Sequence, residues 1–404
     1  MKRSLLLTGC LLGLTLLQAK EFPGRWVASW GTAQQVTEKH NLPPEPGFTN
    51  ATVRQKLRIS IGGDQLRIKF SNELGNGPLT LEAARVALAD GFADAKITPG
   101  TSRMLTFRGK ESVTIQPGAM VISDPVNLSL RPMADVAVTV VTKGAPSDVT
   151  GHPGSRTTSY FAYEGADADA ADLPGARRTD HWYLISGLDV WTNRPAAAAI
   201  AVLGDSITDG RGSTTNGNDR WPDILSQRLR ANPATADVAV LNFGVGGGRI
   251  LRDGLGLSAL RRFDRDLIAN PGVRWIVVLE GINDIGTAAP GTGPATAQEM
   301  ISAYDQMITR AHDHGIKVYG CTIMPFAGFK SYDTPEHQAM RDTVNEWIRT
   351  SGRFDAVIDF DAVARDPADP SKLSAATDQG DHLHLSAGGY KIIGSAIDLK
   401  LFQP

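Results

Sequence analysis

The sequence lacks an excess of charge of either sign, and beyond its first twenty residues it lacks any long apolar run. It holds 41 Lys and Arg residues against 43 Asp and Glu residues, a formal net charge of −2. Without a basic excess to neutralise phosphates, we expect no nucleic-acid partner and no binding to an anionic membrane. We also expect no stable membrane insertion, because a spanning helix needs ~20 consecutive apolar residues. The hydrophobic share of 42% excludes a disordered chain.

The first 19 residues differ from everything that follows. Lys2 and Arg3 form a positive start, Leu5–Leu17 is apolar and almost uncharged, and Ala19 offers a small residue for cleavage. This order is typical of a secretory signal peptide over residues 1–19. We therefore expect a secreted or periplasmic protein.

Cysteine is scarce, with 2 in 404 residues. Leu7–Cys10 resembles a lipoprotein processing box, a minor alternative because the apolar stretch continues well beyond Cys10. Cleavage after Ala19 would remove Cys10 and leave Cys321 alone. We therefore expect no internal disulfide and a fold held by its hydrophobic core.

The N-terminal half of the remaining chain shows a period of two. From Val53 to about Lys143, apolar and polar residues alternate, and short Gly, Pro and Asn turns separate the runs. This pattern predicts half-buried strands of a mainly antiparallel β-sandwich. Residues 144–195, rich in Gly, Pro, Asp and Ala, are interpreted as a long connection. The predicted N-terminal domain with its connection spans residues 20–195.

From residue 196 onward, short continuous apolar runs alternate with helix-like segments. The runs are Ala199–Leu203, Val238–Phe243, Trp275–Leu279, Val318–Cys321 and Ala356–Ile358. Buried parallel strands have this composition, so residues 196–404 are predicted to form an α/β domain with a doubly wound parallel sheet. Ser386 is a suitable N-cap for a closing helix. Ligands of such sheets bind at the carboxyl ends of the strands, so we consider the residues that follow each run.

The first run leads into Gly204–Gly210, which contains Ser206. A serine that leaves a buried strand through a glycine turn is placed for nucleophilic attack, and the turn can direct its N–H at an oxyanion. The alternative is an ordinary turn or helix cap. The nucleophile elbow of α/β-hydrolases is excluded, because Thr208 stands where its second glycine is required.

The next two runs lead into a glycine-rich loop and an asparagine. The loop Gly244–Arg249 is not a dinucleotide site, because Arg249 or Leu251 occupies the position of the last required glycine. Its backbone can still approach a ligand and donate N–H groups, unless it is only a flexible turn. Asn283 carries a neutral amide donor suited to an oxyanion, and its alternative role is an Asx turn.

Asp381-His382-Leu383-His384 stands just before the closing helix. In a turn, Asp381 can hold the Nδ1–H of His384 and leave Nε2 facing a nucleophile. A metal pair of His382 and His384 is the rival interpretation, but it lacks a third well-spaced ligand. His312 and His314 are explained more simply by favourable charge at a helix C terminus. We therefore expect no metal site.

These four segments, taken in order, resemble the blocks of the SGNH hydrolases, also called the GDSL esterase and lipase family. Ser206 matches the first block, Asn283 the third, and Asp381 with His384 the last. The second block fits best at Gly247, with Gly246 and Gly248 as alternatives one position away. The resemblance covers about residues 196–404.

This resemblance implies a flavodoxin-like sheet of the SGNH type and a serine esterase without any cofactor. It assigns Ser206, His384 and Asp381 to a triad. It assigns the oxyanion hole to the N–H groups of Ser206 and Gly247 and to the Asn283 amide.

The N-terminal half, which opens with Arg25–Trp30, resembles that of a bacterial subgroup in which a β domain precedes the hydrolase. Members are often associated with plant polysaccharide breakdown, which implies short acyl esters, above all acetyl, on a carbohydrate. Trp26 or Trp30 could then meet sugar rings, unless both pack in the core. No apolar lid is evident, although residues 288–296 could line the pocket. An arylesterase or lysophospholipase, and a noncatalytic carbohydrate-binding protein, are the alternatives.

Overall fold

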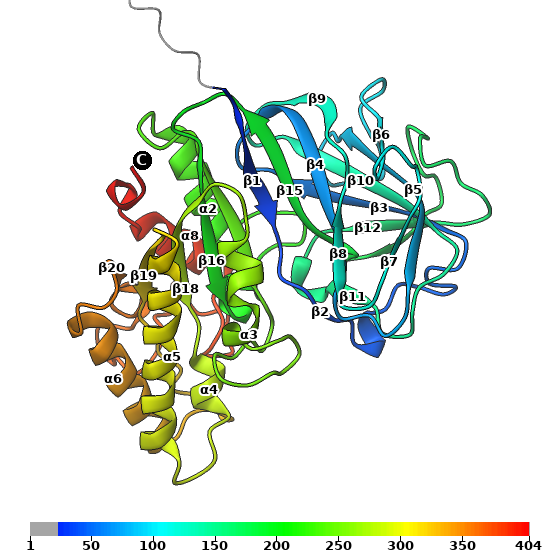
Figure 1. Cartoon of the computed structure of the whole chain (residues 1–404). Coiled ribbons are helices and arrows are strands. Elements are labelled where there is room, and N and C mark those ends of the chain that lie inside the picture. The colour runs from blue at the N-terminus through cyan, green and yellow to red at the C-terminus, as the bar shows by residue number, and fades with distance from the viewer. Residues whose placement is uncertain (1–22, 404) are drawn as a thin grey trace, which may run out of the picture.

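The computed structural model describes residues 23–403, in which an N-terminal β half is followed by a C-terminal α/β half (Figure 1). We call residues 25–192, from the first strand to β15, the β half. We call residues 198–403, from β16 onward, the α/β half. The predicted signal peptide, residues 1–19, lies outside the described residues. Among residues 23–403, no helix combines the length and apolar character that a membrane crossing requires.

The β half is built from antiparallel sheets. One sheet has the strand order β1 (Arg25–Gly31), β15 (Ile185–Thr192), β4 (Gly63–Asn72), β8 (Ala119–Ile122), and β9 (Val126–Leu130) also pairs with β4. The larger sheet has the order β13 (Arg177–Thr179), β12 (Ser159–Ala162), β3 (Ala51–Arg58), β10 (Asp135–Thr142), β5 (Leu79–Leu88), β6 (Arg103–Leu105), and β7 (Val113–Ile115) also pairs with β5. A small third sheet joins β14 (Trp182–Tyr183), β11 (Thr150–His152) and β2 (Gln35–Val36).

The alternating apolar residues lie in the core as predicted, but residues 51–57 of β3 are buried on both faces, so not every strand is half-buried. In β4, Leu66, Ile68 and Phe70 are fully or almost fully buried. Their side chains join one hydrophobic core with Val53 and Leu57 of β3, in the other large sheet. The prediction of a mainly antiparallel sandwich is confirmed.

The interpretation of residues 144–195 as a long connection is wrong. They contain five strands, β11 to β15, and β15 lies between β1 and β4 in the first sheet. Alternation is hidden in β15 because nearly all of its residues are buried, including Asp189. That carboxylate pairs with Arg67 at 2.9 Å and Lys69 at 3.0 Å, which allows a charged residue inside the strand.

The α/β half contains a five-stranded sheet in which every pairing is parallel. The strand order is β17 (Val238–Gly244), β16 (Ala198–Gly204), β18 (Val273–Leu279), β19 (Lys317–Cys321) and β20 (Ala356–Ile358). In domain numbering this order is 2-1-3-4-5, as in flavodoxin-like sheets. All seven residues of β16 are buried, which explains its unbroken apolar run. The predicted doubly wound fold is confirmed.

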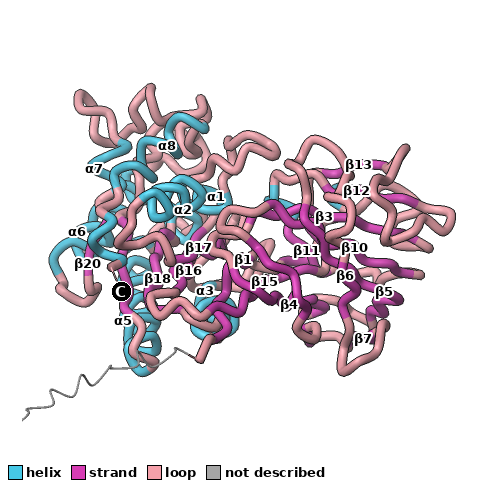
Figure 2. The backbone as a smooth tube through the Cα atoms, turned by 90° about the horizontal axis from the view of Figure 1, so that it is seen from above, coloured by secondary structure: helices cyan, strands magenta, loops and turns pink. Residues whose placement is uncertain are grey.

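Helices cover both faces of this sheet. The longer ones are α2 (Trp221–Ala231), α5 (Gly293–Asp313), α6 (Pro335–Thr350) and α8 (Ala387–Ala396). Figure 2 shows α2 and α8 on one side of the sheet and α5 with the short α3 (Ala259–Phe263) on the other. Ser386 caps α8 as predicted, since its Oγ accepts a 3.1 Å hydrogen bond from the Gly389 N–H.

The two halves share one hydrophobic core. Strand β1 lies beside β17, and Thr32 forms a parallel bridge with Asn242. The Ser60 hydroxyl donates to Val240 O at 3.0 Å and accepts from Val240 N at 3.1 Å, so the β half also hydrogen-bonds to β17 directly. The β half is therefore packed against the edge of the parallel sheet.

Candidate active site

Ser206 lies just beyond the end of β16, the strand between β17 and β18 in the parallel sheet. Strand β16 stops at Gly204, Asp205 caps the next helix by accepting from Ile207 N at 2.9 Å, and Ser206 is the first residue of α1 (Ser206–Asp209). The Ser206 N–H has no acceptor within residues 23–403. This N–H and the Ser206 hydroxyl are therefore both available at the strand end.

His384 and Asp381 reach Ser206 from a loop 178 residues further along the chain, just before α8. His384 Nε2 lies 2.8 Å from Ser206 Oγ, and His384 Nδ1 lies 2.7 Å from Asp381 Oδ2. The other Asp381 oxygen accepts from the backbone N–H groups of Leu383 and His384 at 3.0 and 2.8 Å. The predicted turn holds Asp381 and His384 in one hydrogen-bonded chain with Ser206.

The protonation states suit proton transfer. Burial lowers the pKa of His384 below its ordinary value of 6.5, although Asp381 opposes this shift. Burial would raise the pKa of Asp381, but hydrogen bonds from the His384 backbone and ring lower it to about 2. Near neutral pH the imidazole is therefore neutral, with Nδ1–H donated to an ionised carboxylate and Nε2 free to accept the hydroxyl proton.

Asn283 lies on α4 (Ile282–Gly286), just beyond the end of β18. Its Nδ2 donates one hydrogen to Gly248 O at 2.8 Å, and its Oδ1 accepts from the Tyr332 hydroxyl at 2.8 Å. These two bonds assign the positions of the amide oxygen and the amide nitrogen of Asn283. The second amide hydrogen remains available for a ligand.

The glycine loop after β17 contributes backbone to the same place. Gly246 and Gly247 line the cleft, and Gly247 has a φ of +68°, a conformation that favours glycine. The Gly247 N–H has no acceptor among the residues that the structure describes, whereas the Gly248 N–H donates to Val245 O at 2.9 Å. Among the three glycines, Gly248 is therefore the least suited to donate to a ligand.

A buried acid stabilises this loop. Asp284 accepts from the backbone N–H groups of Ile250 and Leu251 at 2.7 and 3.0 Å, and it directly follows Asn283 in the chain. Burial raises the pKa of Asp284, and it raises the pKa of the neighbouring Asp205 to about 7. Asp284 thus ties the loop that carries Gly247 to the helix that carries Asn283.

The cleft around these residues has a volume of about 590 Å³ and is lined by both halves. The α/β half contributes Ser206, Asp209, Arg211, Gly246, Gly247, Leu255, Asn283, Phe329, Tyr332, Leu383 and His384. The β half contributes Gln35, Glu38, His40, Asn41, Pro153, Gly154 and Arg156. Tyr332 and the residues of the β half were not predicted, because no motif surrounds them in the sequence.

The tryptophans and the loop that the sequence suggested for substrate contact lie outside the cleft. Trp30 is buried against Trp182, with ring centroids 4.9 Å apart, and Trp26 packs against Trp191. Neither lines the cleft, so the expectation of sugar stacking there is wrong for both. The 288–296 loop does not line it either.

His382 and His384, the residues of the rival metal pair, bond to two different carboxylates. His382 Nδ1 pairs with Asp378 at 2.7 Å, while His384 pairs with Asp381. Within residues 23–403, no group of three or more His, Cys, Asp and Glu residues is arranged to hold a metal ion.

Comparisons with known proteins give the family. The model of the GDSL-like lipase/acylhydrolase family matches residues 202–392. No curated protein matches the chain. A solved lipase/acylhydrolase from Enterococcus faecalis is 22% identical, with a TM-score of 0.40, over 51% of this chain and 95% of that one. A carbohydrate acetylesterase family member from Sinorhizobium meliloti is 19% identical, with a TM-score of 0.40, over 50% of this chain and 97% of that one.

The matched residues run from the end of β16 into α8 and include Ser206, Asn283 and His384. Residues 202–392 therefore form a domain of the GDSL-like lipase/acylhydrolase family, and the protein is an ester hydrolase.

Proposed function

We propose that this ester hydrolase works by two-step acyl transfer through Ser206, His384 and Asp381. The observation that carries the proposal is the continuous hydrogen-bonded chain from the Ser206 hydroxyl to His384 and on to Asp381, at 2.8 and 2.7 Å. A nucleophile, a base within reach and a group that orients the base are the three parts that serine catalysis needs.

In the first step Ser206 Oγ bonds to the ester carbonyl carbon, and its proton passes to His384 Nε2. The carbonyl π electrons move to the oxygen, which becomes an oxyanion. When this intermediate collapses, the bond to the alcohol oxygen breaks and His384 returns the proton to that alcohol. Asp381 stabilises the imidazolium that exists between the two transfers.

The oxyanion is held by the Ser206 N–H, the Gly247 N–H and the free hydrogen of the Asn283 amide. This assignment is supported by the hydrogens that are not already donated. Neither backbone N–H has an acceptor within residues 23–403, and Asn283 donates only one of its two amide hydrogens. Donors already fixed in place stabilise developing charge without reorganisation.

In the second step water attacks the acyl carbon of the acyl-enzyme. His384 takes a proton from this water, and the second tetrahedral intermediate collapses with release of the carboxylic acid. The proton held by His384 returns to Ser206 Oγ, so the enzyme is restored with no cofactor consumed.

We further propose short acyl esters, above all acetyl, of a polar alcohol such as a carbohydrate. Support comes from the polar wall that the β half adds to the cleft, which includes Gln35, Glu38 and Asn41. Side chains of this kind can hydrogen-bond hydroxyl groups of the alcohol portion. We also propose export, on the sequence of residues 1–19 alone.

Ser206→Ala tests the mechanism. The variant should fold normally and lose about 10⁶-fold in kcat on 4-nitrophenyl acetate, the scale of loss for a missing triad serine. Ser302→Ala is the matched control, because Ser302 lies on α5, where its hydroxyl donates to Gln298 O. A folded Ser206→Ala variant within about tenfold of wild type would show that the assignment is wrong.

A panel of esters tests the substrate. Rates should fall steeply from acetyl to octanoyl esters, and acetate should be released from acetylated xylan. The alternative, an arylesterase or lysophospholipase, is favoured by the apolar side chains of Leu255 and Phe329 in the cleft. Faster cleavage of octanoyl than acetyl esters, or no acetate from any acetylated glycan, would establish that alternative.

A further inference from the structure

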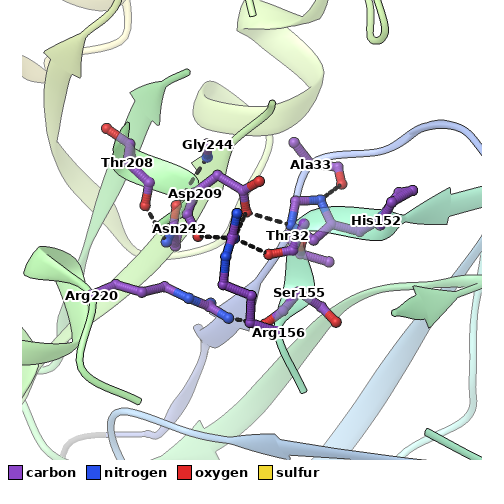
Figure 3. Close-up of polar contacts among 12 residues, drawn as sticks. Thr32, Ala33, His152, Ser155, Arg156, Thr208, Asp209, Arg220, Asn242 and Gly244 are labelled. Carbon is purple, nitrogen blue, oxygen red and sulfur yellow. Dashed lines mark hydrogen bonds and ion pairs between the residues drawn. The ribbon is translucent and has the colours of Figure 1, made fainter. Parts of the chain in front are cut away.

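Asp209 is a buried carboxylate that the two-step mechanism does not use. It is the last residue of α1, three positions after Ser206, and only 2% of it is exposed. Its Oδ1 lies 2.9 Å from His152 Nε2 and 3.7 Å from Arg156 Nη1, which also donates to Asp209 O at 3.1 Å. Figure 3 shows that both partners approach from the β half. The helix that begins at Ser206 is therefore joined to the β half at its other end.

His152 faces hydrogen-bond acceptors with both ring nitrogens. Nε2 faces the Asp209 carboxylate, and Nδ1 lies 2.9 Å from the carbonyl oxygen of Ala33. These two contacts tie the imidazole ring both to α1 and to the backbone of the β half. The ring is buried and stacks on Trp182. A buried carboxylate needs partners, and the His152 ring and the Arg156 guanidinium are the partners of Asp209.

Asp209 is held as the anion by the same groups. Burial would raise its pKa, but His152, Arg156 and Arg220 together bring the pKa below its ordinary value. Removing Asp209 would leave the guanidinium of Arg156 without this carboxylate partner.

The contact between the halves is also tight at the backbone. A Cβ atom on Gly154 would overlap the Asp209 carboxylate, so this position next to α1 admits only glycine without a shift. Arg220, just before α2, donates to Ser155 O and so also links the two halves (Figure 3). Within the α/β half, the Thr208 carbonyl accepts from Asn242 Nδ2 at 2.8 Å. The segment 153–156 and α1 therefore hold each other in place.

We propose that Asp209, with His152 and Arg156, is a positioning residue for Ser206, which makes the β half part of the catalytic unit. This inference rests on the proposed function. A helix of one turn has little stability of its own, so α1 depends on outside contacts for its position. A shift of ~1 Å in a reacting group can cost ~10²-fold in rate.

Asp209→Asn tests the proposal, with Glu73→Gln as its matched control. Glu73 belongs to the β half and pairs with Arg265 of the α/β half at 3.5 Å, so both variants replace an inter-half carboxylate by an amide. Asp209→Asn should lower kcat about 10- to 10²-fold on 4-nitrophenyl acetate, with KM within about twofold. Glu73→Gln should leave both parameters within about twofold.

A second readout separates positioning from folding. The rate of Ser206 labelling by a fluorophosphonate reports the reactivity of the hydroxyl in the folded fraction, without turnover. In Asp209→Asn this rate should fall in parallel with kcat. A folded Asp209→Asn variant with wild-type kcat and labelling would overturn the proposal.

Gly154→Ala decides the question if Asp209→Asn does not fold. It keeps every charge and adds one methyl group against the Asp209 carboxylate. We expect lower kcat and slower labelling at a temperature well below its unfolding midpoint. A folded Gly154→Ala variant with both rates unchanged would overturn the proposal as well.

The outcome for Ser206→Ala distinguishes this inference from the proposed function. An active Ser206→Ala variant would refute the proposed function, whatever the activity of Asp209→Asn. If Ser206→Ala is inactive and Asp209→Asn is fully active, only the positioning role is refuted.

Discussion

Replacing Tyr332 by phenylalanine should slow turnover by a small and calculable factor. The Tyr332 hydroxyl donates to Asn283 Oδ1 at 2.8 Å, and burial raises the pKa of this phenol, which keeps it a neutral donor. Phenylalanine keeps the ring, which packs edge to face on Phe329 with centroids 5.0 Å apart. The substitution therefore removes one hydrogen bond and little packing.

The expected magnitude comes from counting the bonds that hold the Asn283 amide. Two bonds orient it, one to Gly248 O and one from Tyr332, both at 2.8 Å. Loss of one neutral hydrogen bond costs about 1 kcal/mol, or about fivefold in kcat, because 1.36 kcal/mol corresponds to tenfold. Asn283→Ala removes the donor itself and should cost about 10²–10³ in kcat, with little change in KM.

The assay is a double-mutant cycle on 4-nitrophenyl acetate. If Tyr332 acts through Asn283, the double variant should be no slower than Asn283→Ala alone, and the coupling energy should equal the whole effect of Tyr332→Phe, about 1 kcal/mol. Thermal unfolding of each variant provides the check on folding.

Two results would refute the reasoning. If Tyr332→Phe slowed the Asn283→Ala enzyme by the same factor as wild type, Tyr332 would act independently of Asn283. If its effect fell only on KM, Tyr332 would contact the substrate, which its place in the cleft permits. In the same way, a change confined to KM in Asn283→Ala would mean that Asn283 binds substrate.

Hydrolysis should require neutral His384, so kcat/KM should fall as pH decreases through the His384 pKa, which burial lowers below 6.5; a profile with its midpoint above 6.5 would contradict this. Dialysis against a chelator should leave activity unchanged, and a loss restored by zinc would revive the metal pair of His382 and His384. Cys321 should not react with a thiol reagent in the folded protein, because it is buried and burial raises its pKa; labelling should appear only on unfolding.

Most of the fold could be predicted because its pattern is local. The unbroken apolar run of β16 follows from burial on both faces, and the alternation in β4 follows from the hydrophobic core on the face that carries Leu66, Ile68 and Phe70. Strand β15 was missed because periodicity fails where a buried Asp189 replaces an apolar residue. Only its partners Arg67 and Lys69, more than a hundred positions earlier in the chain, explain that carboxylate.

The candidate site likewise contains residues that a local motif could predict and residues that it could not. Ser206, Asn283 and the pair Asp381 and His384 each lie in a short segment at a strand end or before a helix, and the structure brings these segments together at one edge of the sheet. The roles of these residues stay predictions. Tyr332 could not be found from sequence, since it reaches Asn283 across 49 positions from a loop without periodicity.

The β half was expected to be a separate domain. Because it lines the cleft and contacts α1, it can influence both substrate binding and catalysis. The two halves share a hydrophobic core, and the β half provides both the His152 contact to α1 and polar side chains that line the cleft with Ser206. Substitutions in these two regions should have different kinetic effects. Gln35 and Asn41 line the cleft and hydrogen-bond Glu38 at 3.1 Å, with no contact to the triad, so their loss should change KM and the choice of alcohol. His152 reaches Ser206 only through Asp209, so its loss should change kcat for every ester alike.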